Sequence, residues 1–343
     1  FEPVDFYESE DMYWVYYRVN KEVYRKKKEE KKEQATSRAF TLFKSGKEAE
    51  NNHEPFTAIS YFLKGLEEVK PYLSEEIPVQ YKGKNIDLGI NLLSSIRNIS
   101  DNLSIAPVQP EYKAKRSFTL TIPVRFKVKY QGLAVPDAPV KLSYSGGYLI
   151  NNAKQTNHEG LVECQTGRIP SRNQQEYVRA SLQLENIAEE AVKDMFIRGM
   201  MKKLKVPEAK TIISIQKALI KPVIKNARLK RTDIDKIHGI VEEKAKDYQF
   251  QTVFNARQYD YRLEINCSYH QGESAGSLTS SLLQASLYLK DREGNILADR
   301  YADDIKGIGS GQREAENKAF SNFTGQLQRR LLDQLLDQGL GYQ

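Results

Sequence analysis

The chain has 343 residues, of which 40% are hydrophobic and 28% are charged, and its net charge is +7. This composition is typical of soluble globular proteins and excludes a disordered chain or a helical membrane-spanning one, while the length allows two or three domains. The two cysteines, Cys164 and Cys267, fall in different predicted domains, so we expect neither a disulfide framework nor a thiolate metal site.

Residues 1–20 end in the aromatic and β-branched run YWVYYRV, which predicts a strand, and Asn20 is a good N-cap for a helix after it. The next segment predicts one long helix, whose first half is charged and solvated, and then a second helix. Small residues face large ones along this pair, a pattern that resembles a single tetratricopeptide-like helical hairpin. One such hairpin cannot bury its own apolar face, so we expect it to pack on another surface. A third helix from about Ile86 to Leu103 completes a helical region at 21–104.

The hydrophobic period changes from helical spacing to strict alternation at Ser117. The segments SFTLTIPVRFKVKY, PVKLSYSG, LVECQTG and EYVRASLQLE are predicted strands that are separated by turn signals. Their spacing predicts an immunoglobulin-like β-sandwich at 112–188. The turn TNHEG, Thr156–Gly160, also resembles a turn that is common in bacterial immunoglobulin-like modules.

The last part of the chain, residues 191–343, is predicted to be a mixed α/β domain. TIISIQKALIKPV predicts a strand and TDIDKIHGIVEEKAKDY a helix, while Leu282–Leu289 and Ile296–Ile305 are expected to form a hairpin. In the long final helix, an apolar residue recurs every four positions from Ala315 to Leu335. The expected fold class is therefore α+β and multidomain, with a tetratricopeptide-like hairpin, an immunoglobulin-like sandwich and a C-terminal α/β domain.

Three glycines in KGIGSGQREAENKAF, residues 306–320, raise the alternative of a nucleotide-dependent enzyme with a phosphate-cradling loop. A P-loop needs a lysine and a hydroxyl after its last glycine, and here Gln312 and Arg313 follow Gly311. The glutamates that come next suit the positive end of a helix dipole but would repel a phosphate. We therefore interpret the segment as the entrance to a helix, with Ser310 or Gly311 as its N-cap.

The ionisable residues form no catalytic or metal-binding pattern. His53, His158, His238 and His270 are scattered and have no carboxylate at ligand spacing, so surface or hydrogen-bonded histidines are the better interpretation. We therefore expect no catalytic residue, no cofactor and no metal, and predict that the protein is not an enzyme.

Basic residues gather in the segment 202–231, which contains ten Lys or Arg residues and one acidic residue. Such a segment attracts anionic glycan, anionic lipid or nucleic acid, although the absence of aromatic residues from it weakens the nucleic-acid alternative. The other interpretation is that Lys217, Lys221 and Lys225 are solvated and guard an exposed strand edge against aggregation. The residues of this candidate anionic-ligand or partner surface are Lys202, Lys203, Lys217, Lys221, Lys225, Arg228, Lys230 and Arg231.

Three segments resemble a known family. YWVYYRVNKEVYRKKKEEKKEQA, Tyr13–Ala35, is similar to the closing strand and following helix of the twenty-kilodalton outer-membrane lipoprotein (Lpp-twenty) family, in the longer form of Bacteroidota-type envelopes. Phe40–Leu73 is similar to the helices that follow in that form. ILADRYADDIKGIGSGQREAENKAF, Ile296–Phe320, resembles a strand, turn and helix of envelope lipoproteins related to that family, to the curli-pore lipoprotein and to flagellar assembly protein T.

This resemblance implies that most of the lipoprotein domain, with its lipid-bearing cysteine, precedes Phe1, and that residues 1–20 are the end of this N-terminal α/β domain. It also implies a lipid-anchored protein on the periplasmic side of the outer membrane, and it offers no catalytic residue. We therefore expect a non-enzymatic scaffold or accessory subunit that contacts other envelope proteins or further copies of itself, and no nucleic acid. The alternative is a binder of anionic glycan or lipid that uses residues 202–231.

Overall fold

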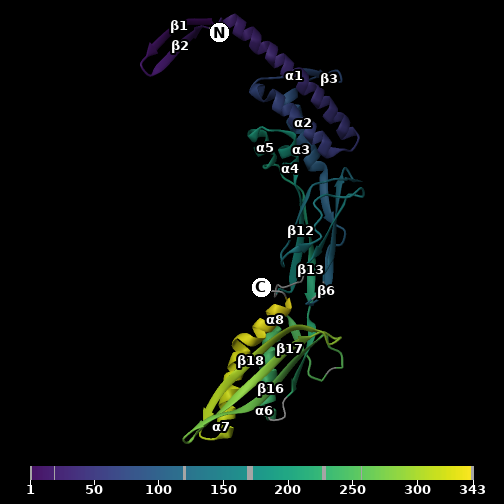
Figure 1. Cartoon of the computed structure of the whole chain (residues 1–343). Helices are drawn as coiled ribbons and strands as arrows, with labels where there is room; N and C mark the ends of the chain where they lie inside the picture. Colours follow the sequence, from purple (N-terminus) through teal and green to yellow (C-terminus); the bar gives the residue numbers. More distant parts are fainter. Residues whose placement is uncertain are drawn as a thin grey trace.

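The structure is a computed structural model that describes residues 2–18, 20–118, 121–167, 173–225, 229–255 and 257–340. These residues form an elongated molecule in which an N-terminal hairpin, a helical region, a pair of sheets and a C-terminal domain follow one another (Figure 1). The chain is mixed α and β with several sheets, as its sequence predicts. None of the described helices has the length and apolarity needed to cross a membrane.

The N-terminal hairpin consists of β1 (Glu2–Ser9) and β2 (Met12–Arg18), and α1 (Lys21–Asn51) leads from it into the helical region. Asn20 caps α1, because its side-chain oxygen accepts hydrogen bonds from two amides of the first turn. The first buried residue of α1 is Ala35. The charged first half of this helix is therefore in solvent, as its composition predicts.

The helical region is built on α2 (Pro55–Val69) and α3 (Leu88–Asn102), which pack with the second half of α1. A Cβ atom at Gly46 would lie only 2.4 Å from the Phe62 ring, so the glycine allows α1 and α2 to cross closely. The region also holds β3 (Pro78–Tyr81), β4 (Lys84–Asp87), the 3₁₀ turn η1 (Lys70–Tyr72), and two later helices that return to α2, namely α4 (Leu184–Ala191) and α5 (Met195–Met201).

Two sheets follow the helical region and share its hydrophobic core. The first sheet has the order β10 (Leu149–Ile150), β11 (Leu161–Thr166), β7 (Pro123–Tyr130), β5 (Leu103–Pro107), with β8 (Leu133–Ala134) beside β7. The second has the order β6 (Glu111–Lys115), β13 (Glu208–Gln216), β12 (Gln175–Leu182), β9 (Val140–Tyr144). Inward and outward residues alternate along these strands, as in Val124, Phe126 and Val128 of β7, which explains the period of two in the sequence.

The single strand predicted from TIISIQKALIKPV is wrong, because the structure has two strands there. β13 ends at Gln216 and pairs with β12 in the second sheet, whereas β14 (Ala218–Lys225) pairs with strands of the C-terminal sheet. Lys217 alone separates them, so the sequence has no glycine or proline that signals the change of sheet. The sheets therefore divide the chain at Lys217 and not near residue 190.

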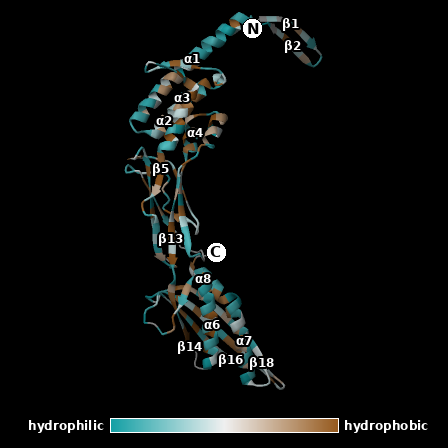
Figure 2. Ribbon diagram, turned by 180° about the vertical axis from the view of Figure 1, so that it is seen from behind, coloured by the Kyte–Doolittle hydropathy of each residue, from teal (hydrophilic) through white to brown (hydrophobic). Residues whose placement is uncertain are grey.

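The C-terminal domain has a five-stranded sheet with three helices on one face (Figure 2). The strand order is β15 (Phe250–Thr252), β14, β16 (Tyr261–Ala275), β17 (Leu278–Lys290), β18 (Ile296–Gly309), and the helices are α6 (Arg231–Asp247), α7 (Gln312–Gln326) and α8 (Leu332–Leu340). The predicted hairpin is confirmed as β17 and β18, which pair antiparallel. This domain has its own hydrophobic core, formed where the helices pack on the sheet.

The final helix contains a five-residue π-helical segment, η2 (Leu327–Leu331), between α7 and α8. The spacing of four between apolar residues exceeds the α-helical repeat of about 3.6, so each step drifts by about 40° around a regular helix. The wider π-helical turn absorbs this drift. As a result, all the apolar positions from Ala315 to Leu335 are buried.

Phe118 joins the two cores, because it lies in the link between β6 and β7 but belongs to the core of the C-terminal domain. Its ring stacks on Phe250 at 5.3 Å between centroids and meets Tyr261 edge-on at 4.7 Å. Its backbone amide donates a hydrogen bond to the Tyr261 hydroxyl. Lys115 adds an ion pair with Asp260 across the same junction.

We expect Phe118→Ala to destabilise the C-terminal domain by about 3–5 kcal/mol, because it leaves a cavity beside the Phe250 and Tyr261 rings. Hydrogen exchange followed by mass spectrometry should show faster exchange in β16 and α8, with β7 less affected. Tyr177→Ala, at a 40% exposed residue of β12, is the control and should leave all three unchanged. Unchanged protection of β16 in the Phe118 variant would contradict this account of the junction.

Candidate functional site

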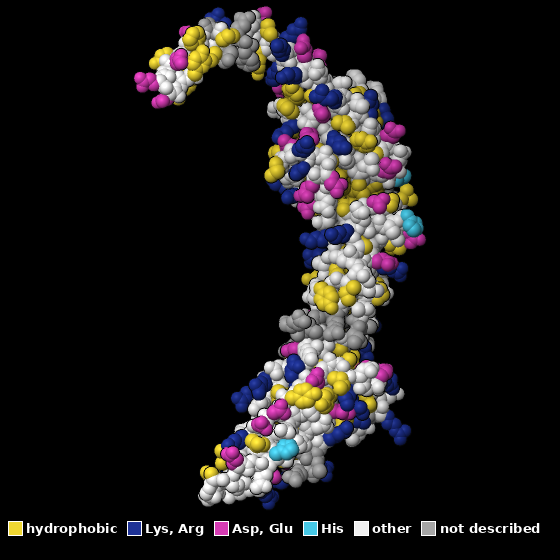
Figure 3. Space-filling view, in the orientation of Figure 1, with side chains coloured by type: hydrophobic (Ala, Val, Ile, Leu, Met, Phe, Trp, Pro, Cys, Tyr) yellow, Lys and Arg dark blue, Asp and Glu magenta, His cyan; other side chains and the backbone are white. Residues whose placement is uncertain are grey.

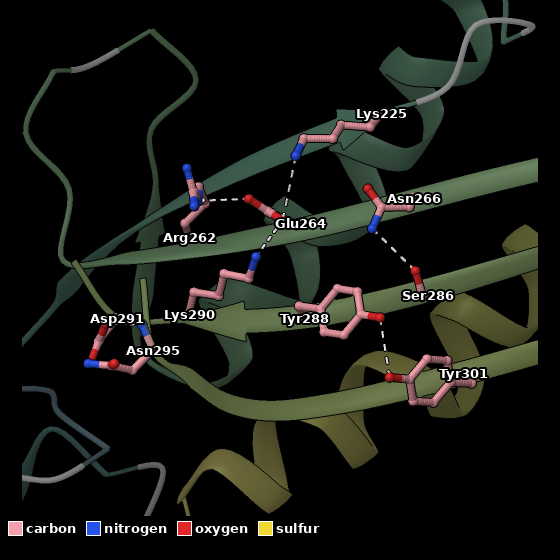
Figure 4. A network of polar contacts seen from close by, with 10 residues as sticks. All are labelled: Lys225, Arg262, Glu264, Asn266, Ser286, Tyr288, Lys290, Asp291, Asn295 and Tyr301. Atoms are coloured by element: carbon pink, nitrogen blue, oxygen red, sulfur yellow. Dashed lines mark hydrogen bonds and ion pairs between the residues drawn. The ribbon is translucent and has the colours of Figure 1, made fainter. Parts of the chain in front are cut away.

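The candidate site is the face of the C-terminal sheet opposite its helices, which carries no helix among the described residues (Figures 1 and 3). Side chains alternate between the two faces of a strand, so residues in register share a face. Arg262, Glu264 and Asn266 of β16 lie opposite Lys290, Tyr288 and Ser286 of β17, respectively, and Figure 4 shows this row of polar side chains. We call it the polar face.

Glu264 is the centre of the polar face, and only 4% of the residue is exposed. Its carboxylate lies 2.8 Å from Lys290 Nζ, 3.0 Å from Arg262 Nε and 3.7 Å from Lys225 Nζ (Figure 4). The hydrogen bond from Lys290 and the three positive charges together lower the pKa of Glu264, against the effect of burial. Glu264 is therefore ionised at neutral pH, and it holds three cations from three strands in one place.

Hydroxyl and amide groups continue the polar face towards β18. The Tyr288 and Tyr301 hydroxyls are 3.2 Å apart, and Asn266 Nδ2 donates a hydrogen bond to Ser286 Oγ (Figure 4). At the opposite end, the Lys221 ammonium lies 5.5 Å from the centre of the Tyr259 ring. The face thus offers cations, hydroxyls and aromatic rings to a polar partner, and Glu264 neutralises part of its charge.

The structure places the predicted basic residues in two parts of the molecule. In the C-terminal domain, Lys221 and Lys225 lie on the polar face, and Lys230 and Arg231 lie at the start of α6. Lys217 is exposed at the entrance to this domain, between β13 and β14, and Arg228 lies outside the described residues. Lys202 and Lys203 follow α5 and lie in the helical region instead. The segment 202–231 is therefore not one continuous surface.

The strand-edge interpretation of these lysines holds for only part of β14. This strand lies between β15 and β16 as far as Ile220, and beyond it the described residues provide β16 alone as a neighbour. Sequence reasoning missed Arg262, Glu264 and Lys290, whose pairing depends on strand register. The alternating charges of RLEIN were the available signal, since they place Arg262 and Glu264 on one face.

A second candidate surface lies between α3 and α5, where a groove of about 470 Å³ is mainly apolar. Ile90 and Leu93 of α3 and Met200 of α5 line it, and Arg97 and Lys203 are the cations in its lining. Ile90 is 66% exposed and Leu93 is 39% exposed, so the apolar lining of the groove faces solvent. We call this the α3–α5 groove.

The N-terminal hairpin exposes large apolar side chains on both of its faces, and in Figure 3 they follow its length. Phe6, Tyr7, Met12, Tyr13, Trp14 and Tyr16 are each 57–68% exposed. The strand predicted from YWVYYRV is confirmed, but the sequence alone did not show that no described element covers it.

The glycine-rich segment of β18 serves packing. A Cβ atom at Gly307 would lie 2.1 Å from the Ala315 carbonyl oxygen of α7, and one at Gly309 would lie 2.6 Å from the Ala315 amide nitrogen. The glycines therefore let α7 lie directly on the strand. Glu314 accepts hydrogen bonds from the amide and the hydroxyl of Ser310, and Lys318 and Ser310 lower the pKa of Glu314 to about 2.

The chain's own carboxylate thus accepts the hydrogen bonds that Ser310 offers just before α7. Gly311 is the N-cap, one of the two residues expected. No group of three metal-ligating side chains is found in the part of the chain that the structure describes. Of the histidines, His238 packs at 4.6 Å from the Phe254 ring, and burial lowers the pKa of its imidazole.

No family model and no curated protein matches the chain. Among solved structures, a minor lipoprotein from Acinetobacter baumannii is 14% identical, over 35% of this chain and 90% of its own, with a TM-score of 0.24. A lipoprotein from Neisseria meningitidis is 14% identical over 34% and 96% of the two chains, at 0.22. The adhesin InvE from Yersinia pseudotuberculosis is 9% identical over 60% and 59%, at 0.23. Likenesses with TM-scores this low carry no inference about this chain.

We expect Glu264→Gln to lower the free energy of unfolding by about 1–3 kcal/mol at pH 7, because the charged hydrogen bond from Lys290 is lost and three cations remain together. The pKa of Glu264 is lowered by folding, so its contribution is present above the unfolded value of about 4.3 and is lost as pH falls below it. Urea unfolding from pH 7 to pH 3 should show a shallower loss of stability in the variant. Glu163→Gln, at an exposed ion pair, is the control, and equal slopes in all three proteins would refute the role of Glu264.

Gly307→Ala and Gly309→Ala should each destabilise the C-terminal domain by about 1–3 kcal/mol, because the added methyl group meets the backbone of α7. Gly311→Ala is the matched control, since open space surrounds that position and its φ of −166° suits any residue. Thermal unfolding of the three variants measures the difference. Equal stability of the Gly307 and Gly311 variants would show that the glycines have another role.

Proposed function

We propose that this chain is a non-enzymatic cell-envelope lipoprotein of the outer membrane, which acts as a scaffold or accessory subunit through protein–protein contacts. The single observation that carries the proposal is the N-terminal hairpin, whose aromatic side chains are exposed on both faces. A patch of this kind marks a contact surface in a soluble domain. The lipid anchor and the outer-membrane location rest on the resemblance of Tyr13–Ala35 and Phe40–Leu73 to the Lpp-twenty family.

The modular arrangement supports a scaffold. In this proposal, α1 and α2 are a tetratricopeptide-like hairpin, and the two-sheet region is an immunoglobulin-like sandwich that separates the helical region from the C-terminal domain. The two ends of the elongated molecule have different surfaces, an aromatic hairpin at one and the polar face at the other (Figure 3). Such a molecule can hold two partners apart while it contacts both.

A second candidate function is the binding of an anionic glycan or lipid by the polar face. Lys221, Lys225, Arg262 and Lys290 share this face with Glu264 and, by register, with Asp299, so the cations outnumber the carboxylates. Anionic ligands are attracted by such an excess, and salt weakens the attraction. This surface includes only part of the segment 202–231.

Site-specific photo-cross-linking tests the scaffold. A photoreactive residue in place of Trp14 should cross-link to particular envelope proteins in native membranes, because this side chain is 58% exposed on the hairpin. The same residue in place of Lys141, exposed on β9, is the control and should give few products. Mass spectrometry identifies the partners. Recovery of only the uncross-linked chain from both positions, although it is folded and membrane-bound, would end the scaffold proposal.

The double variant Lys221→Glu/Lys225→Glu separates the two candidate functions. A scaffold should keep its cross-linked partners, whereas a ligand-binding protein should lose a salt-sensitive retention on heparin or on anionic vesicles. Lys129→Glu/Lys141→Glu, at exposed positions of β7 and β9, makes the same charge change elsewhere.

A further inference from the structure

The hairpin and the α3–α5 groove are two apolar surfaces that no described element covers. A two-stranded hairpin with both faces in water is marginally stable at best, so an occupant would stabilise this one. Its strands place Tyr7 beside Trp14 on one face and Phe6 beside Val15 on the other. Any occupant of the hairpin must therefore offer apolar surface.

The hairpin is strongly acidic. Residues 2–18 contain five carboxylates and one arginine, a net charge of −4. Glu8, Glu10 and Asp11 lie at the turn between the strands, where all three are exposed, and Figure 3 shows acidic side chains at this free end. A complementary surface would be apolar in its centre and basic at its rim.

The α3–α5 groove has this composition. Its apolar lining comes from Ile90, Leu93 and Ile96 on α3 and from Met200, Met201 and Leu204. Methionine side chains adapt their shape to an incoming surface and make favourable contacts with aromatic rings. Arg97 and Lys203 lie in the lining, and Lys202 and Lys205 are exposed beside it, with no acidic residue between 202 and 205.

The wall of the groove is held in place before any partner arrives. Glu67 of α2 accepts hydrogen bonds from the backbone amides of Lys193 and Asp194, each at 2.9 Å, at the start of α5. Asp194 also caps α5 and pairs with Lys70. A groove with fixed walls loses little entropy when it binds.

The occupant comes from another molecule. In one chain, the solvated first half of α1 carries the hairpin away from α3 and α5 (Figure 1). This half of α1 is itself basic, but Val23 and Tyr24 are its only exposed large apolar residues, so it offers charge without an apolar bed. We propose that the acidic aromatic hairpin of one copy docks into the α3–α5 groove of a second copy.

This inference rests on the proposed scaffold function and names its partner as a second copy of the chain. The contact joins two different surfaces, so it is heterologous and generates a ring or an open row of molecules. The apolar contacts provide most of the affinity, and the opposite charges fix the pairing and make it sensitive to salt.

Paired charge reversal tests the contact. The hairpin variant Glu10→Lys/Asp11→Lys brings the net charge of residues 2–18 from −4 to 0, and the groove variant Lys202→Glu/Lys203→Glu brings the four cations of the groove and its edge from +4 to 0. Each alone should self-associate about tenfold more weakly than the natural chain, or worse, because the attraction between acidic hairpin and basic groove is lost. An equimolar mixture should recover the association, since the natural hairpin of the groove variant then meets the natural groove of the hairpin variant. Analytical ultracentrifugation measures all four samples, and Lys26→Glu/Lys27→Glu on α1 is the control.

Fluorescence gives a second readout at the contact itself, because Trp14 is the single tryptophan of the chain. Its emission should shift to the blue as the concentration of the natural chain rises, and not in the groove variant. Circular dichroism confirms that the variants fold.

A natural chain that remains monomeric with unshifted Trp14 emission would overturn the inference, as would a mixture of variants that does not associate. A shift that requires anionic vesicles and does not depend on protein concentration would overturn it in favour of a membrane surface. The cross-linking at Trp14 remains a separate test, since partners other than the chain itself would keep the scaffold function while the self-contact fails.

Discussion

The packing of Phe118 among the aromatic rings of the C-terminal domain is the contact on which the elongated arrangement depends. The chain reaches this domain twice, once as a short excursion between β6 and β7 and once as the single residue between β13 and β14. A long molecule with separate cores has few places where one part constrains another. Here, a buried ring and the ion pair of Lys115 with Asp260 do so where the two-sheet region meets the C-terminal domain.

The surfaces at the two ends of the molecule differ in the side chains that they expose. The hairpin leaves aromatic side chains in water and carries an excess of acid, whereas the polar face buries a carboxylate beneath cations. Glu264 makes the polar face rigid, because three strands contribute side chains to one charge. Among its described side chains, the hairpin is tied by its backbone ladder, by the stacking of Phe6 on Tyr13 and by a hydrogen bond from the Ser9 hydroxyl to the Met12 carbonyl oxygen. One end is therefore organised by its own ion pairs, whereas the other leaves its aromatic rings exposed.

Much of the local structure was predictable from the sequence, because periodicity and caps act over a few residues. The helices around Phe43 and Phe62, the cap at Asn20 and the hairpin of β17 and β18 belong to this class. The change of sheet at Lys217 was not predictable, since an alternating pattern is the same in either sheet. The cluster around Glu264 was not predictable either, because it depends on the register between strands. The exposure of the hairpin depends on which elements cover it. The sequence alone gives neither the register nor the covering elements.

The π-helical segment Leu327–Leu331 lets the C-terminal helix hold one residue more than a regular helix of the same length. The extra residue is taken up in the wide turn, so Leu335 and Leu336 stay directed at the sheet. Loss of a single residue there would restore a regular helix and leave α8 on the same face, whereas loss of one residue from the regular turns of α8 would rotate the rest of it by about 100°. In evolutionary terms, a one-residue gap between related chains is best tolerated at this segment of the helix.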